Sequence, residues 1–216
     1  MPGLPDLNTP RLKLRQWRAD HVDALHALWI DAGVRRYLWD DEIISRERAA
    51  EVVEEALELI EAREIGMWSV YLGAEPEIIG FCGLREMHDR EGFELLYAIM
   101  QDYWGQGLVV EASRAVLRDA FDRCGFESVT ALADPPNLAS FRVMEKLGMQ
   151  FESEGISDGL PARFYRIDAA QFALTLYTWD DARPGPSSAD RTPRLLGSAS
   201  DAVLRAMARA GCSGPR

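Results

Sequence analysis

The chain has 216 residues, of which 47% are hydrophobic, and its 24 Lys and Arg against 35 Asp and Glu give a formal net charge of −11. That length and composition allow one sizeable core. No apolar run approaches the ~18 residues that a membrane-spanning helix needs, and the N-terminus lacks the apolar stretch of a secretory signal. The negative charge argues against a general affinity for nucleic acid, and it suits either plain solubility or a cationic substrate such as an amine.

The three cysteines, Cys82, Cys124 and Cys212, are odd in number and have no CxxC spacing. This usage predicts a reduced, cytoplasmic protein with neither a disulfide framework nor a zinc site. The three histidines have no partner motif and are interpreted as surface residues.

The N-terminal third alternates strand and helix patterns. Residues 11–17 alternate apolar and polar side chains, which predicts a half-buried strand. A helix follows from Asp20, with Val22, Leu25, Leu28 and Trp29 on its buried side, and ends at Gly33. A second helix, residues 46–64, buries an apolar stripe and turns a row of glutamates to water or to a cationic ligand. Residues 67–72 and 78–84 read as a pair of strands.

The most informative stretch is residues 93–126. An apolar strand, 93–100, leads through a turn with Gly105 and Gly107 into an amphipathic helix from Leu108. The first N–H groups of a helix have no intrahelical partner and carry a partial positive charge, so they bind anions. Glycines let a phosphate approach the bare backbone. The turn therefore predicts a pyrophosphate site.

The remaining chain completes a mixed α+β pattern. Residues 128–133 form a predicted strand, which Asp134-Pro135-Pro136 ends, and Asn137 caps a helix that runs to Leu147 before Gly148. Residues 149–152 and 162–167 are further strands. We therefore predict one domain over residues 1–180. Residues 181–216, with six Arg against two Asp within 182–216, form a tail rich in Pro, Ser and Arg that is disordered or holds one short helix.

The sequence of this turn does not match either of two common nucleotide-binding motifs. A dinucleotide-binding motif needs a third glycine and a βαβ unit with an acidic residue at the end of the next strand. A P-loop needs Lys-Ser/Thr after the glycines. Neither is present.

Two segments resemble a known family. Residues 103–112, YWGQGLVVEA, resemble motif A of the GCN5-related N-acetyltransferases (GNAT), and residues 137–149, NLASFRVMEKLGM, resemble motif B of the branch typified by RimJ and RimL. With TPRLKLR at the start and IIGFCGL in the 78–84 strand, the resemblance covers residues 8 to about 170. It implies a GNAT fold, in which helices flank a mixed, mostly antiparallel sheet that has a V-shaped splay between its central strands.

The resemblance also implies an acetyl-CoA site. The pyrophosphate would lie on the backbone from Gly105 to Val110, the pantetheine arm would run beside the 95–100 strand, and the N–H of Ile99 or Met100 would stabilise the oxyanion. The cofactor-binding residues implied are Ile99, Met100, Gln101, Trp104, Gly105, Gln106, Gly107, Leu108, Val109, Val110, Asn137, Ser140 and Lys146. No metal is expected.

The catalytic residues implied are Glu94, Ser140 and Met100. Glu94 occupies the place where GCN5 carries its base, and an outward-facing strand glutamate is the alternative interpretation. The Tyr that protonates the departing thiolate in many relatives is Met144 here, so Ser140 is the candidate acid. Tyr97 and Tyr165 are second candidates, although a tyrosine in a strand is more often part of the core.

The expected function is transfer of an acetyl group from acetyl-CoA to a primary amine, either a protein N-terminal α-amine or a small amine, by direct attack in a ternary complex. A non-catalytic acyl-CoA-binding regulatory module is the alternative. No nucleic-acid or membrane partner is expected, and because dimers are common in this branch, a homodimer remains an open alternative.

Overall fold

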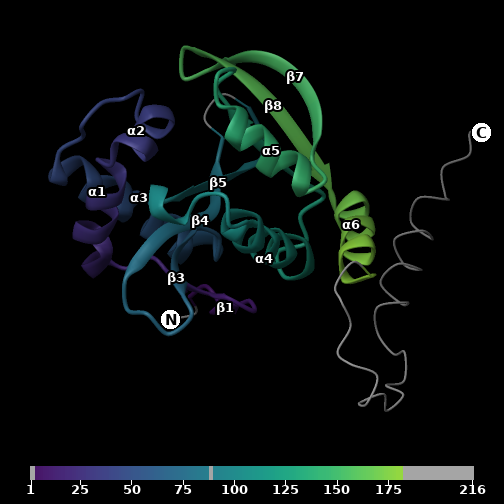
Figure 1. Cartoon of the computed structure of the whole chain (residues 1–216), viewed down its shortest axis with the longest axis horizontal. Coiled ribbons are helices and arrows are strands. Elements are labelled where there is room, and N and C mark those ends of the chain that lie inside the picture. Colours follow the sequence, from purple (N-terminus) through teal and green to yellow (C-terminus); the bar gives the residue numbers. More distant parts are fainter. Residues whose placement is uncertain (1–2, 88–89, 182–216) are drawn as a thin grey trace, which may run out of the picture. The chain divides into compact units, whose positions relative to one another are not determined.

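The computed structural model describes residues 3–87 and 90–181. Within them the chain forms one eight-stranded sheet with flanking helices (Figure 1). The strands are β1 (Leu7–Asn8), β2 (Leu12–Gln16), β3 (Met67–Leu72), β4 (Ile78–Glu86), β5 (Phe93–Ile99), β6 (Ser128–Ala133), β7 (Gln150–Ser157) and β8 (Leu160–Asp168). The helices are α1 (Val22–Trp29), α2 (Ala32–Leu38), α3 (Arg46–Arg63), α4 (Leu108–Asp122), α5 (Leu138–Lys146) and α6 (Ala169–Asp181), with 3-10 turns η1 (Ala19–His21) and η2 (Gln101–Tyr103).

The sheet has the strand order β1-β2-β3-β4-β5-β6-β8-β7. The pairs from β1 to β5 are antiparallel, as is β7 with β8, whereas β5 and β6 run parallel. This is the mixed, mostly antiparallel sheet of the GNAT fold, so the predicted fold class is confirmed.

Helices cover both faces of this sheet. Phe81 belongs to the buried cluster under α1 and α3, whereas the next residue of β4, Cys82, contacts Ser113 of α4. Because successive residues of a strand point to opposite faces, α1–α3 and α4 lie on opposite sides of β4.

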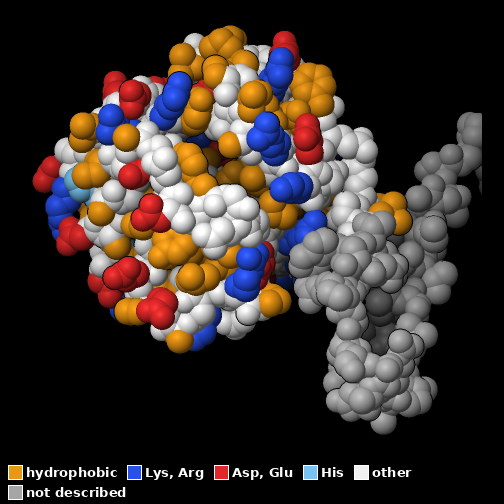
Figure 2. Space-filling model, viewed as in Figure 1, with side chains coloured by type: hydrophobic (Ala, Val, Ile, Leu, Met, Phe, Trp, Pro, Cys, Tyr) orange, Lys and Arg blue, Asp and Glu red, His pale blue; other side chains and the backbone are white. Residues whose placement is uncertain are grey.

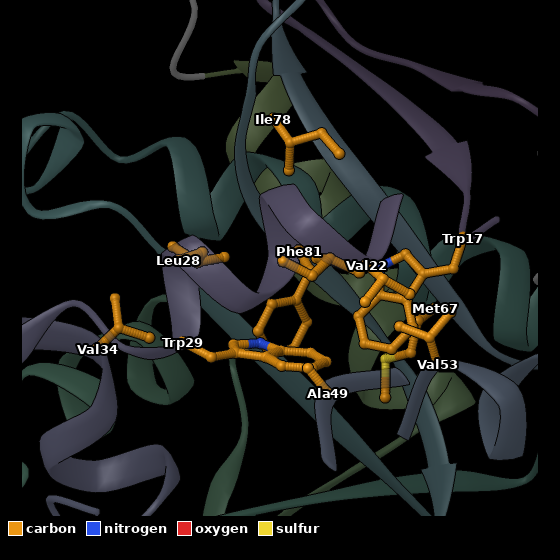
Figure 3. Packing of buried hydrophobic residues seen from close by; sticks show 11 residues of the cluster. Trp17, Val22, Leu28, Trp29, Val34, Ala49, Val53, Met67, Ile78 and Phe81 are labelled. Atoms are coloured by element: carbon orange, nitrogen blue, oxygen red, sulfur yellow. The ribbon is translucent and has the colours of Figure 1, made fainter. Parts of the chain in front are cut away.

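An aromatic cluster forms the core between the sheet and α1–α3. Figure 3 shows the Trp29 indole reaching from α1 towards the Phe81 ring, and the two ring centroids are 6.1 Å apart in an edge-to-face arrangement. Trp17 packs against both rings, at 5.6 and 5.5 Å. Full burial of such a side chain contributes about 1.5–3 kcal/mol or more, so this cluster fixes the helical layer on the sheet.

The parallel pair β5–β6 opens towards its carboxyl end. Among the described residues, β5 and β6 pair at a single position, Glu94↔Thr130, although β5 continues to Ile99 and β6 to Ala133. The later residues of the two strands therefore form no continuous ladder. We call the space between them the β5–β6 opening.

Three expectations need correction. The helix expected to end at Gly33 ends at Trp29, and Gly33 lies in the first turn of the unpredicted α2, where Asp31 Oδ1 accepts from Gly33 N at 2.9 Å. The strands β7 and β8 are longer than expected. His21 is not a surface residue, because its side chain is 13% exposed and its Nδ1 lies 3.0 Å from Ser69 Oγ.

The chain divides into two compact units, residues 1–167 and 168–216, and residues 182–216 lie outside the described part. In the second unit, α6 was not predicted. Its start has a reciprocal cap, in which Asp168 Oδ1 accepts from Gln171 N at 2.8 Å and Gln171 Oε1 accepts from Asp168 N at 3.1 Å. The predicted tail and its domain boundary stay predictions. Among the described residues, no helix is long and apolar enough to cross a membrane.

Candidate active site

The glycine turn lies between β5 and α4, as the sequence predicted. Gly105 and Gly107 have φ angles of 74° and 75°, a left-handed conformation that favours glycine, and Gly107 is the N-cap of α4. Leu108 and Val110 are buried and hold the first turn against the sheet. The turn itself is exposed at Gly105, Gln106 and Gly107, so a ligand can reach the N–H groups at the start of the helix.

The edge of β5 that faces the opening carries Tyr97 and Ile99. Met100 N donates to Ile79 O of β4 at 2.9 Å, which directs the N–H of Met100 away from the opening. Because backbone groups alternate along an antiparallel strand, the N–H and C=O groups of Tyr97 and Ile99 face the other way. The expectation that Met100 supplies an oxyanion donor is therefore wrong for its N–H, which is already bonded, and Ile99 remains as the candidate.

Trp104 lies beside the same strand end rather than in the glycine turn. Its Nε1 donates to Ile99 O at 2.9 Å, and its ring approaches Gly33 so closely that a Cβ there would be 3.0 Å away. The indole N–H is therefore the hydrogen-bond donor to the Ile99 carbonyl, and this bond fixes the end of β5. Gln101 opens η2 and is exposed.

Tyr97 and Ser140 meet across the opening. The Tyr97 hydroxyl lies 2.8 Å from Ser140 Oγ, although the two residues are 43 positions apart in the chain. Burial raises the pKa of the Tyr97 phenol, more than the hydrogen bond with Ser140 lowers it, so the phenol stays protonated at neutral pH. The Tyr97 hydroxyl also lies 3.3 Å from the Ser140 carbonyl oxygen, to which it can donate, so Ser140 holds the phenol at two points at the edge of β5.

The start of α5 positions Ser140. Asn137 caps the helix, since its Oδ1 accepts from Ser140 N at 3.2 Å. Met144, at the position where many relatives carry Tyr, is 1% exposed and is a core residue. Tyr165 stacks on Phe141, with centroids 5.6 Å apart. Lys146 is exposed at the far end of α5, and its carbonyl accepts from Arg114 at 2.8 Å.

Glu94 lies at the closed end of the opening. It is 3% exposed, is ion-paired with Arg85 on the neighbouring strand, and sits at the one recorded pair of β5 with β6. Ile99 lies five positions beyond Glu94, which corresponds to roughly 16 Å along a strand. A base at Glu94 would thus be far from a thioester beside Ile99, and these contacts argue against that expected role.

Asp134 lies nearer to the open end, and the sequence analysis had interpreted it only as the end of a strand. Asp134 follows directly after Ala133, the last residue of β6, beyond the single pair that joins β6 to β5. It lies close enough to Asp40, between α2 and α3, for the charge of Asp40 to act on its carboxyl. Burial and then the charge of Asp40 raise the pKa of the half-buried Asp134 carboxyl.

The two sides of the opening differ in character. A small hydrophobic hollow between the sheet and α4 is lined by Tyr97, Ile99, Leu108, Val109 and their neighbours, among them Cys82. Burial raises the pKa of the Cys82 thiol to about 12, so it is not an available nucleophile. In Figure 2 acidic side chains lie mostly over the part of the face that α1–α3 occupy in Figure 1, whereas Lys and Arg lie mostly over α4 and α5.

Comparison with known proteins identifies the family. The model of the acetyltransferase (GNAT) domain matches residues 11–150. An uncharacterised N-acetyltransferase, p20, of Bacillus licheniformis is 25% identical over 170 residues, which are 78% of this chain and 94% of that protein. The uncharacterised N-acetyltransferase YoaA of Bacillus subtilis is 28% identical over 155 residues, 70% of this chain and 85% of its own.

Solved structures agree on the fold. A GNAT-family acetyltransferase from Bordetella pertussis superposes with a TM-score of 0.66 at 23% identity, covering 75% of this chain and 98% of that one. RimL, described as a ribosomal L7/L12 α-N-protein acetyltransferase in complex with coenzyme A, superposes with a TM-score of 0.65 at 18% identity, covering 76% and 98%. The family model and the relatives named as N-acetyltransferases define the class as acetyltransferases. The chain belongs to the acetyltransferase (GNAT) family.

Proposed function

We propose that this chain transfers an acetyl group from acetyl-CoA to a primary amine, by direct attack while donor and acceptor are bound together. The observation that carries the proposal is the hydroxyl pair of Tyr97 and Ser140, 2.8 Å apart at the edge of the β5–β6 opening. A protein that only binds acyl-CoA needs no protonated hydroxyls at the edge of this opening, whereas an enzyme can use them to protonate the departing thiolate.

The donor side of the site is suited to an acyl-CoA. The exposed turn at Gly105, Gln106 and Gly107 and the first N–H groups of α4 would hold the pyrophosphate. The backbone groups of Tyr97 would pair with the amide groups of the pantetheine arm, as an added strand pairs with a sheet edge. The fold that the chain shares with RimL, a protein solved with coenzyme A, supports this arrangement.

The backbone N–H of Ile99 would stabilise the oxyanion of the tetrahedral intermediate. Its carbonyl already accepts from Trp104, which holds the peptide in a fixed orientation before substrate binds. Ser140, backed by the Tyr97 phenol, would give a proton to the thiolate as the thioester bond breaks. The Tyr97 phenol would pass its proton to Ser140 and take one back from solvent, so that both hydroxyls are protonated before the next turnover and no buried phenolate is left.

The attacking amine must first lose a proton. An α-amine has a pKa near 7.7–8.0, so only weak base assistance is needed at neutral pH. Asp134 is our candidate for this step, because it follows the end of β6 beside Asp40 and its raised pKa makes it a better proton acceptor. Its carboxylate, with that of Asp40 nearby, would also attract a cationic amine.

The acceptor is a primary amine, either a protein N-terminus or a small molecule such as a polyamine. RimL is described as acting on the α-amine of ribosomal L7/L12, which supports including peptide N-termini among the substrates to test. A cytoplasmic location and a homodimer also stay proposals.

A thiol-release assay over a panel of amines tests the proposal. Purified protein is incubated with acetyl-CoA and, in turn, dipeptides, polyamines and aminoglycosides, and CoA binding is measured by calorimetry in parallel. We expect amine-dependent release of CoA and an acetylated product by mass spectrometry. Tight CoA binding without turnover on any amine would instead favour the non-catalytic acyl-CoA-binding module.

A further inference from the structure

The loop between β1 and β2 is joined to the start of α4 through Glu111. This carboxylate is largely buried, with 9% of the side chain exposed, and accepts three hydrogen bonds from residues about a hundred positions away. Thr9 Oγ1 donates at 2.6 Å, Arg11 N at 3.0 Å and Arg11 Nε at 2.7 Å. An ion pair from Arg11 Nη2 at 2.6 Å completes the set.

The charge state of Glu111 follows from these contacts. Burial alone would raise the pKa of its carboxyl, but the hydrogen bonds from Thr9 and Arg11 and the charge of Arg11 together outweigh burial and lower the pKa. The carboxylate is therefore ionised at neutral pH and forms an ion pair with Arg11.

The same guanidinium also holds the glycine turn. Arg11 Nη1 donates to Gln106 O at 3.0 Å, and Arg11 Nη2 is 3.9 Å from the point where a Cβ on Gly107 would lie. The Gln106 carbonyl and the Gly107 N–H belong to one planar peptide group and point in opposite directions. Fixing the carbonyl against Arg11 therefore fixes the direction of the Gly107 N–H, away from Arg11.

We propose that Thr9, Arg11 and Glu111 form a positioning clamp that orients the Gln106–Gly107 peptide to bind the pyrophosphate of the acyl donor. The inference rests on the proposed function, because it takes acetyl-CoA as the donor. Arg11 acts here through the peptide it holds rather than as a catalytic residue. Its planar group reaches Glu111 and Gln106 at once, a geometry that the single ammonium of lysine cannot reproduce.

The test compares acetyl-CoA with S-acetylpantetheine, which lacks both the pyrophosphate that the clamp serves and the adenosine 3′-phosphate joined to it. Arg11→Ala should raise KM for acetyl-CoA about tenfold, equal to about 1.4 kcal/mol, and leave kcat close to the wild-type value. With S-acetylpantetheine, which lacks the pyrophosphate, variant and wild type should have the same kcat/KM. Arg11→Lys should behave like Arg11→Ala, because it keeps the charge but not the double contact.

Arg15→Ala is the matched control. Arg15 lies on β2 near Arg11 and pairs with Asp6 and Asn8 at the surface instead of with α4. It should leave both donors unaffected, and urea unfolding of each variant confirms that the fold is retained.

Calorimetric CoA binding separates this inference from the proposed function. A wild-type protein that binds CoA while Arg11→Ala binds it equally tightly would overturn the clamp alone. So would an equal loss with both donors, or full recovery of affinity by Arg11→Lys. If the wild type binds CoA but acetylates no amine, the proposed transfer fails and the comparison of CoA affinities still decides the clamp. A wild type that does not bind CoA overturns both.

Discussion

The hydroxyl pair of Tyr97 and Ser140 makes a prediction that depends on the chemistry of the leaving group. Ser140 Oγ is 2.8 Å from the Tyr97 hydroxyl, and the raised pKa of the phenol keeps it protonated. A positioned acid typically accelerates a reaction 10²–10⁴-fold. Because an alkyl thiolate is already a moderate leaving group, we expect Ser140→Ala to lower kcat by the smaller factor, about 10²-fold or 2.7 kcal/mol.

The assay varies the thiol of the donor. With acetyl-CoA, Ser140→Ala and Tyr97→Phe should both lower kcat, and the double variant should lose little more than Ser140→Ala, since the two groups act as one chain. An acetyl thioester of an acidic aryl thiol needs no proton on departure, so with that donor the variants should approach wild type. Tyr71→Phe, which removes a phenol that contacts His21, is the control and should change neither rate.

Two results would refute this reasoning. A loss in the variants that is the same for alkyl and aryl thioesters would mean that the hydroxyls do not protonate the leaving group. Strictly additive losses in the double variant would mean that Tyr97 and Ser140 act independently, despite the contact between them.

Three further predictions concern titration and reactivity. Ionisation of the amine, near pH 7.7–8.0, gives kcat/KM an acid limb in every variant, and Asp134 should add a second, lower break, above the ordinary aspartate value of about 3.9 because the Asp134 pKa is raised. Asp134→Asn should remove this lower break alone, and a lower break that persists in the variant would exclude Asp134 as the base. Glu111→Gln should lower the free energy of unfolding at pH 7 by about 2 kcal/mol, because it weakens charge-assisted hydrogen bonds. Since the folded-state pKa of Glu111 is lowered, its contribution is complete above the unfolded value of about 4.3 and is lost as pH falls through the folded value, so urea titrations of variant and wild type should converge in acid. Cys82 should resist iodoacetamide in the native protein at pH 8 and react after denaturation, as mass spectrometry of the alkylated peptides would show.

Local patterns in the sequence predicted most of the sheet and three helices correctly. The stripe of α4 and the alternation of β2 repeat with the helix and strand periods, and tertiary contacts reinforce both. The short α2 was not predicted, because a glycine usually follows the end of a helix, whereas Gly33 lies in the first turn of α2. Asp31 makes this possible by capping the Gly33 and Val34 N–H groups at 2.9 and 3.3 Å.

The candidate site was harder to predict, because its parts meet only in three dimensions. Ser140 was found through its motif, whereas its partner Tyr97 lies on strand β5, belongs to no motif and was only a second candidate. Met100 and Ile99 differ by one position, and only the pairing of β5 with β4 decides which N–H faces the opening. The position of Glu94 in the sequence suggested a general base, but the sequence alone does not show that Glu94 forms an ion pair with Arg85.

The alternation along β5 explains how one strand can serve two substrates. Tyr97 and Ile99 border the hollow beside α4, whereas Leu96 and Met100 pack on the α1–α3 side. A proton donor for the thiolate and a proton acceptor for the amine must stay apart, because two such groups in contact would exchange the proton with each other. In the proposed reaction the pleat of β5 would help to separate them, because Tyr97 points to the α4 side while Asp134 lies near Asp40, between α2 and α3. A shift of β5 by one residue against β4 would exchange these faces, so the pairing of β5 with β4 fixes which substrate approaches from which side.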